Sequence, residues 1–180
     1  MRQEGGGMGR NGGSMQQERG LTLVELVVTI AVAAILMAIA MPSLQSFLLN
    51  SKVRSAAGRL QEDLQMARAE AVKTNQVVAL NISAANGVCT WNLAPSFSSY
   101  NPMTATRYQS EYASVSCTAT ASQICFDPLG TLAPGGNCAL GGTFTFTPNS
   151  AGTTWLVLVG AGGRVTSCLQ SAGGGCYIAP

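Results

Sequence analysis

The sequence contains no histidine, and charged residues are scarce in its C-terminal part. Residues 75–180 include four charged side chains: Arg107, Glu111, Asp127 and Arg164. The most common general base is therefore missing, and neither a Gly-x-Ser-x-Gly elbow nor a Lys-Ser/Thr phosphate loop occurs. A net charge of +2 over 180 residues is too small for a strongly basic nucleic-acid binder. We therefore expect neither an enzyme nor a bound cofactor.

The six cysteines all follow residue 75, and none of them form a Cys-x-x-Cys pair. Without histidine or such a pair, buried thiols or a metal site are poorer explanations than disulfides in an oxidising compartment. Six cysteines allow 15 pairings, and the sequence alone cannot choose among them. Loop closure favours near neighbours, which predicts Cys89–Cys117, Cys125–Cys138 and Cys168–Cys176.

One acidic residue interrupts a long apolar run near the N-terminus. Leu21 to Met41 is a stretch of 21 residues in which Glu25 is the only charged side chain. About 20 residues suffice to cross a bilayer. A carboxylate at the centre of a membrane helix costs roughly 2.5–3.5 kcal/mol on insertion scales, and such residues usually have a partner. Glu25 is therefore a candidate interaction site.

The order of glycine, apolar run, acid and proline resembles the signal of type IV pilins and pseudopilins. The resemblance implies that a prepilin peptidase cuts after Gly20, so that residues 1–20 are a leader that is removed. Leu21, where the family most often has phenylalanine, would become the N-methylated mature N-terminus. A secretory signal peptide differs, because its cleavage site follows the apolar core. The resemblance also implies that Glu25 pairs with the N-terminal amine of a neighbouring subunit, and that Pro42 kinks the helix.

The helical pattern continues beyond Pro42. We expect a helix over 21–74, with 21–41 in the membrane and the second part packed on a globular domain. Pro42 removes a backbone donor and should bend or open this helix, and two separate helices are the alternative. The packed face is predicted from apolar residues that recur at steps of four and three, namely Val53, Ala57, Leu60, Leu64, Ala67 and Ala71.

From residue 75 onwards the sequence predicts strands. Segments rich in β-branched and aromatic residues alternate with turn signals. We expect loops at 95–106 and 128–141, and a β-rich, disulfide-containing domain over 75–180. A long N-terminal helix packed on an antiparallel sheet is an α+β architecture. The expected strands lie at 77–82, 87–93, 111–117, 142–147, 154–159 and 164–168.

The C-terminal part resembles GspH/FimT-type minor pilins and pseudopilins. The resemblance rests on the order of helix, strands, the segment 125–130 (Cys-Phe-Asp-Pro-Leu-Gly) and the late Gly163-Arg164-Val165. Some DNA-binding members carry Gly-Arg-x-Arg, and here Thr166 stands in place of the second arginine. DNA affinity grows with the number of phosphates neutralised, so Arg164 alone is a weak candidate contact for DNA.

These features predict a minor pilin subunit of a type IV pilus that contributes to assembly and is a candidate for DNA uptake or adhesion. The expected partners are other pilins or pseudopilins, the prepilin peptidase, the inner membrane and DNA. Before assembly we expect a single-pass inner-membrane protein with a periplasmic domain, and afterwards a location in the pilus or at the cell surface. The alternative is a pseudopilin of a type II secretion system. A membrane-anchored periplasmic enzyme is less well supported, because catalytic groups are missing.

Overall fold

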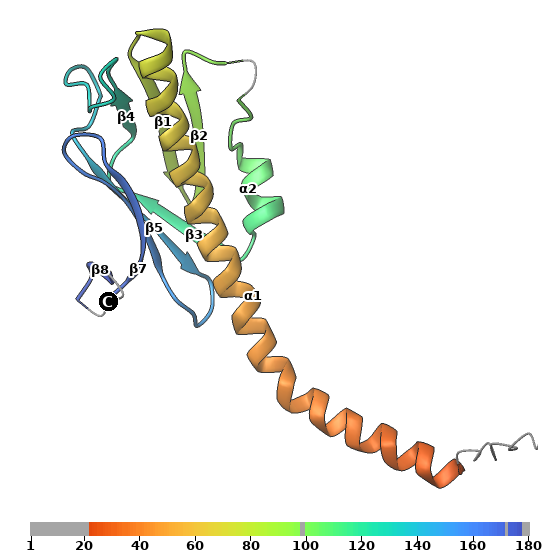
Figure 1. Ribbon diagram of the computed structural model, residues 1–180. Helices are drawn as coiled ribbons and strands as arrows, with labels where there is room; N and C mark the ends of the chain where they lie inside the picture. The colour runs from red at the N-terminus through yellow and green to blue at the C-terminus, as the bar shows by residue number, and fades with distance from the viewer. Residues whose placement is uncertain (1–21, 98–99, 172, 178–180) are drawn as a thin grey trace, which may run out of the picture. The chain divides into compact units, whose positions relative to one another are not determined.

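The computed structural model describes residues 22–97, 100–171 and 173–177 of the 180-residue chain. The predicted leader, including Gly20, and the predicted mature terminus Leu21 lie outside these residues. The chain divides into two units, Met1–Ala40 and Met41–Pro180. Along the described residues the elements follow the order α1 (Leu23–Thr74), β1 (Val78–Ala85), β2 (Val88–Ala94), α2 (Ala105–Tyr112), β3 (Val115–Ala119), β4 (Gln123–Phe126), β5 (Gly142–Pro148), β6 (Trp155–Val159), β7 (Val165–Gln170) and β8 (Cys176–Tyr177) (Figure 1).

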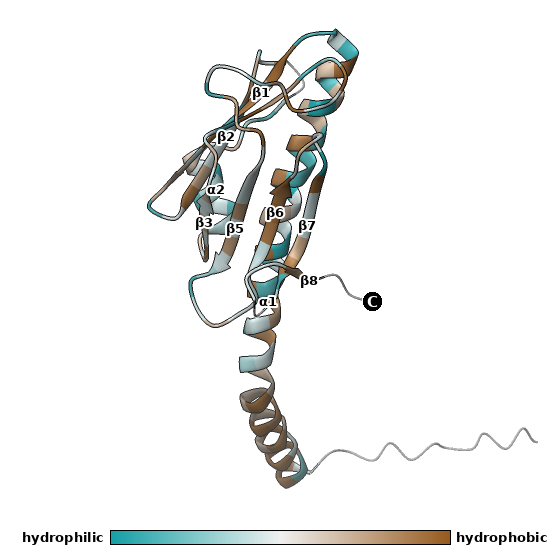
Figure 2. Ribbon diagram, turned by 90° about the vertical axis from the view of Figure 1, so that its left-hand side faces the viewer, coloured by the Kyte–Doolittle hydropathy of each residue, from teal (hydrophilic) through white to brown (hydrophobic). Residues whose placement is uncertain are grey.

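The part of α1 that belongs to the first unit is apolar on all sides. Figure 2 shows its hydrophobic colouring around the helix. Leu23 and Ile39 are 78% and 73% exposed, and no residue of the most apolar window is buried. A helix that is hydrophobic all round is typical of a membrane span. By length and composition α1 can cross a bilayer.

The part of α1 in the second unit packs through an apolar face. The six residues predicted for this face are all fully buried, which confirms the helical periodicity. Figures 1 and 2 show this part of the helix lying along one face of the sheets. Pro42 lies inside α1, and the helix continues on both sides of it. The bend expected at Pro42 stays a prediction.

The strands form two antiparallel sheets, with the orders β2-β1-β4 and β3-β5-β6-β7-β8. Phe144 and Phe146 of β5 both point to the core and are fully buried, as the alternation with threonine predicts. The sheets meet where β2 lies beside β3, because Cys117 donates its backbone N–H to the carbonyl of Gly87 at 2.9 Å. The α+β class with an antiparallel β domain is confirmed. The division into two sheets was not predicted.

The expected strand at 111–117 is wrong at its start, because α2 extends into the segment. Thr104 caps α2 by accepting a hydrogen bond from the backbone N–H of Arg107 at 3.3 Å. Arg107 then pairs with Glu111 one turn later, at 2.8 Å. A capped turn with an i,i+4 ion pair and a buried tyrosine, Tyr108, is a helix signal that outweighs the short alternation in the sequence.

Candidate functional site

Helix α1 begins at a hydrogen-bonded cap that includes Glu25. The side-chain oxygen of Thr22 accepts from the backbone N–H of Glu25 at 3.2 Å, and its carbonyl accepts from Leu26 at 3.1 Å. Thr-x-x-Glu is the spacing of a capping box, and an acidic side chain in the first turn is also favoured by the helix dipole. Thr22 was not predicted as a cap, although its Thr-x-x-Glu spacing is a sequence signal for one.

The position of Glu25 in the first turn places it near one end of the apolar segment. The insertion cost quoted above applies to the centre of a membrane helix, so the cost at Glu25 is smaller. Its carboxylate makes no ion pair or side-chain hydrogen bond with the described residues. An acid that is exposed on an apolar helix end and has no partner in the described part of its own chain is available to pair with another chain.

Arg164 lies in the turn between β6 and β7, where Gly163 is held close to a neighbouring loop. Gly163 has a φ of +76°, and a Cβ at this position would lie 2.7 Å from the carbonyl oxygen of Gly130. Only glycine fits both the left-handed backbone and this close approach. Packing therefore explains the glycine of the Gly-Arg pair. Arg164 itself is exposed.

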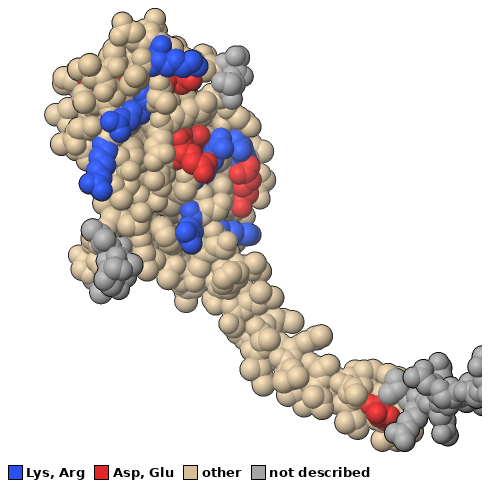
Figure 3. Space-filling model, viewed as in Figure 1, with Lys and Arg blue, Asp and Glu red and all other residues tan. Residues whose placement is uncertain are grey.

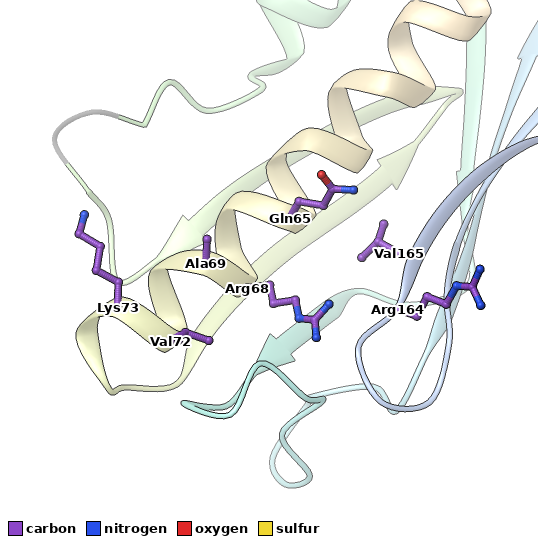
Figure 4. Close-up of a pocket in the computed structure, with 7 residues that line it drawn as sticks. All are labelled: Gln65, Arg68, Ala69, Val72, Lys73, Arg164 and Val165. Carbon is purple, nitrogen blue, oxygen red and sulfur yellow. The ribbon is translucent and has the colours of Figure 1, made fainter.

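Arg164 lies at the edge of a cleft of about 530 Å³ between the end of α1 and the start of β7, and Figure 4 shows its guanidinium turned away from Arg68. Figure 4 shows Arg68 and Arg164 on opposite sides of this cleft. The side chain of Arg68 rests on Gly130, where an added Cβ would come within 3.0 Å of its Nε. We call this the basic cleft, and it is lined by Gln65, Arg68, Ala69, Val72, Lys73, Arg164 and Val165.

The cleft therefore brings Arg68, which the sequence analysis did not single out, to the same site as Arg164. Lys73 at the rim forms an ion pair with Glu70 at 3.1 Å, so its charge is partly compensated. Most of the surface visible in Figure 3 carries no charge, and several basic side chains lie apart from the acidic ones. A ligand with negative charge and some apolar surface fits this lining best.

The buried acid Asp63 belongs to the core. It accepts a hydrogen bond from the indole N–H of Trp91 at 2.7 Å and forms an ion pair with Arg59 at 3.3 Å. The i,i+4 spacing of Arg59 and Asp63 on α1 brings the two side chains within reach of each other. Burial raises the pKa of Asp63 above its usual value, and this outweighs the opposing effects of Trp91 and Arg59. These contacts join α1 to β2, so Asp63 is explained by packing.

The two carboxylates beyond residue 75 also have structural roles. Glu111 is engaged by Arg107. Asp127 accepts hydrogen bonds from the backbone N–H groups of Leu129 and Thr131 and from the Thr131 hydroxyl, and these bonds lower its pKa. No group of three or more histidine, cysteine, aspartate or glutamate residues with metal-binding geometry is found among the described residues.

Three disulfides connect the six cysteines, and they are the three pairs that loop closure favoured. Cys89–Cys117 joins β2 to β3, with Cα atoms 5.7 Å apart. Cys125–Cys138 closes the loop after β4, and Cys168–Cys176 ties β8 to β7, each with Cα atoms 5.4 Å apart. The predicted pairing is therefore confirmed.

A capped apolar helix with one acid, whose second part packs on a disulfide-linked antiparallel β domain, defines the class of pilin-like proteins. The family profile described as type II transport protein GspH matches residues 56–163, more than half of the chain. A second profile, the prokaryotic N-terminal methylation motif, matches residues 15–41. This chain belongs to the GspH family of minor pilins and pseudopilins.

Among solved structures, the chain is similar to a type IV minor pilin and to a minor pseudopilin. The type IV minor pilin FimU of Pseudomonas aeruginosa has 19% identity and a TM-score of 0.47, over 67% of this chain and 90% of FimU. The minor pseudopilin EpsH from the type 2 secretion system of Vibrio cholerae has 14% identity and a TM-score of 0.49, over 66% of this chain and 97% of EpsH. No curated protein matches the sequence significantly.

Family membership sets the general role of the chain. Members of the family are structural subunits, and they assemble with other pilins or pseudopilins into filaments. The methylation motif together with the exposed apolar part of α1 fits a membrane-anchored pilin with a periplasmic domain.

Proposed function

We propose that this chain is a minor pilin subunit of a type IV pilus, cleaved after Gly20 and N-methylated on Leu21. Residues 1–20 are the leader, 21–74 the helix and 75–180 the β domain. The observation that carries the proposal is the single carboxylate of Glu25, which has no partner among the described residues, at the start of an apolar segment matched by the methylation motif. The prepilin peptidase and the inner membrane are partners before assembly.

The chemistry of assembly follows from the apolar surface of the anchor. When α1 leaves lipid for a filament of similar helices, one apolar environment replaces another, so little hydrophobic free energy changes. Among the residues of the anchor, Glu25 undergoes the largest change of environment on assembly, because it is charged. In a low dielectric an acid is strongly favoured beside a positive group, and the new amine of Leu21 in a neighbouring subunit supplies one. Glu25 thereby sets the register of the subunit in the filament.

A comparison of Glu25→Ala with Glu25→Gln separates charge pairing from helix capping. Glutamine can take the place of glutamate in a capping box, but it carries no charge. If pairing is the role, both variants insert into the membrane, but both enter filaments at levels at least about tenfold lower. Each variant leaves the buried amine of the neighbouring Leu21 without a partner, and such an unpaired charge costs roughly 3–5 kcal/mol. Immunoblots of sheared pili and of membranes measure the two pools.

The control is Thr22→Val, which removes the cap but keeps the charge of Glu25. It should enter filaments at nearly normal levels. Normal incorporation of Glu25→Gln together with failure of Thr22→Val would show that Glu25 acts in the cap, and the pairing mechanism would then be wrong.

The second candidate is a pseudopilin of a type II secretion system, which the description of the matching family profile also fits. Both candidates use the same anchor and the same acid, so the Glu25 variants do not separate them. Deletion of the gene does. Loss of surface pili with normal protein secretion supports the pilus subunit, whereas loss of secreted enzymes with normal pili supports the pseudopilin.

DNA is a candidate ligand of the basic cleft, because Arg68 lines the cleft together with Arg164 and gives it a second cation. Two arginines neutralise few phosphates, so we expect weak binding that falls steeply with salt. Arg164→Ala and Arg68→Ala should each weaken it. Arg107→Ala, a basic residue of α2 outside the cleft, is the matched control. Titration of the mature chain in nanodiscs at low and physiological salt measures the affinity.

Tight binding at physiological salt that survives both cleft substitutions would place DNA on another surface. The absence of binding at either salt concentration would leave the filament role without a DNA function.

A further inference from the structure

Trp155 is held against α1 by a set of contacts at the start of β6. The guanidinium carbon of Arg54 lies 5.3 Å from the centre of the Trp155 ring, a cation–π distance. The side-chain oxygen of Asn50 accepts hydrogen bonds from the backbone N–H and the hydroxyl of Thr153, at 2.9 and 3.1 Å. These bonds fix the loop before β6 to the helix and therefore fix where Trp155 lies.

Trp155 shares a hollow of about 350 Å³ with Phe47, which is 67% exposed. Leu44 and Leu48 beside it on α1 are 57% and 51% exposed. This is a large apolar and aromatic surface for a globular unit to leave open to water. We call it the aromatic hollow, and it is lined by Phe47, Asn50, Ser51, Arg54, Thr153, Trp155 and Leu169.

Arg54, the one charged residue that lines the hollow, is basic. The segment from Pro42 to Gln61 contains Lys52, Arg54 and Arg59 and no acidic residue. Lys52 and Arg54 are exposed. An aromatic surface with basic side chains is complementary to anionic phospholipid headgroups, since tryptophan prefers the interface between lipid and water and cations are attracted to the lipid phosphates.

Chain connectivity places the hollow near the bilayer. Phe47 follows Met41, the last residue of the apolar run, by six helical residues, which span about 9 Å at 1.5 Å per residue. The headgroup region extends roughly 5–8 Å beyond each side of the hydrocarbon core. Membrane helices are commonly tilted by about 20°, and by up to about 40°, and such a tilt brings Phe47 to the outer part of this region. Leu44, Phe47, Ser51 and Arg54 follow one another at steps of three or four, so one side of the helix leads from the apolar run to the hollow.

We propose that the aromatic hollow rests on the headgroup region of the inner membrane before assembly. Phe47 and Trp155 insert their rings at the interface, and Lys52 and Arg54 contact lipid phosphates. The contact holds the periplasmic domain against the bilayer and is released when the subunit enters a filament. This inference depends on the membrane-anchored state in the proposed function.

Tryptophan fluorescence tests the contact, because the chain has two tryptophans and Trp91 is 1% exposed. The mature chain is reconstituted in nanodiscs of phosphatidylglycerol and phosphatidylethanolamine that carry bromine close to the headgroups. We expect these lipids to quench part of the emission, and Trp155→Phe to abolish this quenching. A melting temperature close to that of the wild type verifies that the variant is folded.

Two charge variants test the basic part of the hollow. Arg54→Gln should reduce the quenching, and the reduction should be greatest in discs rich in phosphatidylglycerol. Arg107→Gln removes one positive charge from α2 and should leave the quenching unchanged. Equal effects of the two variants would overturn the assignment of Arg54 to the lipid contact.

The outcomes separate this inference from the proposed function. Alkaline washing of membranes releases peripheral proteins but not membrane-spanning ones. If the chain stays in the washed membranes but brominated lipids do not quench Trp155, the anchor is correct and the lipid contact is wrong. If the Trp155 emission changes only when filaments assemble, a neighbouring subunit occupies the hollow and the lipid contact is again wrong. Release of the chain by alkali would overturn the membrane anchor itself, and the lipid contact with it.

Discussion

Asp63 carries its carboxylate into the core between α1 and β2, and burial makes its charge costly there. Its pKa is raised in the folded chain, so the native state binds a proton more tightly than the unfolded state does. The native state therefore gains stability as the pH falls through the raised pKa towards the ordinary value, and it loses this contribution as the pH rises. The indole of Trp91 needs an acceptor at every pH.

Two substitutions of Asp63 separate the hydrogen bond from the charge. Asp63→Ala should lower the free energy of unfolding by about 1–3 kcal/mol, because it leaves the buried indole N–H of Trp91 without an acceptor. Asp63→Asn keeps an acceptor and removes the charge, so it should be at least as stable as the wild type at pH 7. Thermal unfolding of the mature chain in detergent, followed by Trp91 circular dichroism, measures both.

The pH dependence provides the control. The advantage of Asp63→Asn should shrink as the pH falls towards 4, because the wild-type carboxyl becomes protonated. A constant difference between the two proteins across this range would contradict the assignment of the charge as the destabilising feature.

Single residues differ in how far the sequence alone predicts them. Glu25 and Arg164 belong to local motifs, so their candidate roles could be proposed without a structure. Arg68 and Trp155 could not, because their interest depends on what folding places beside them, Arg164 in one case and Phe47 in the other. Long-range neighbours leave no local signal in one sequence.

At the scale of elements, two of the disulfides are expected to differ in how much they stabilise the fold. Cys89–Cys117 joins two sheets across 28 residues, and its cysteines are 0% and 2% exposed. Cys168–Cys176 ties a two-residue strand to β7 across 8 residues. The loop-closure estimate gives about 3.5 kcal/mol for the first bond and about 2.5 kcal/mol for the second. Removing the first also leaves a cavity in the core.

We therefore expect the double substitution of Cys89 and Cys117 to alanine to lower the melting temperature of the mature chain more than the same change at Cys168 and Cys176. Calorimetry of the variants and the wild type in one detergent measures the difference. The opposite order would show that the bond between the sheets contributes less than its loop length and burial predict.

Long elements could be predicted from the sequence and short ones could not. The buried face of α1 repeats over many turns, so its periodicity is unambiguous. Helix α2 has eight residues and depends on the Thr104 cap. Strand β4 has four residues, and it exists because it pairs with β1, where Leu80 lies opposite Ile124. Pairing partners far apart in sequence decide such short strands.

At the scale of the whole molecule, the chain contains two surfaces suited to different surroundings. The exposed apolar part of α1 requires lipid or other apolar helices, whereas the second unit has its own core and three disulfides suited to an oxidising compartment. A subunit of this kind must be inserted before it is assembled. The position of the cut in the N-terminal segment decides whether the apolar part remains.

Processing after Gly20 should give a mature protein that begins at Leu21 and carries one methyl group on its amine. The resemblance to pilin signals and the match to the methylation motif support this expectation. Intact-mass analysis of the protein purified from membranes measures the start and the methylation together. Gly20→Glu should block the cut, whereas Gly13→Glu, in the same glycine-rich segment, should not. A protein that begins at Met1, or one cut beyond Met41, would show that the segment is not a prepilin signal. The free amine that Glu25 needs would then be absent from the start of α1, and the pairing mechanism would be wrong as well.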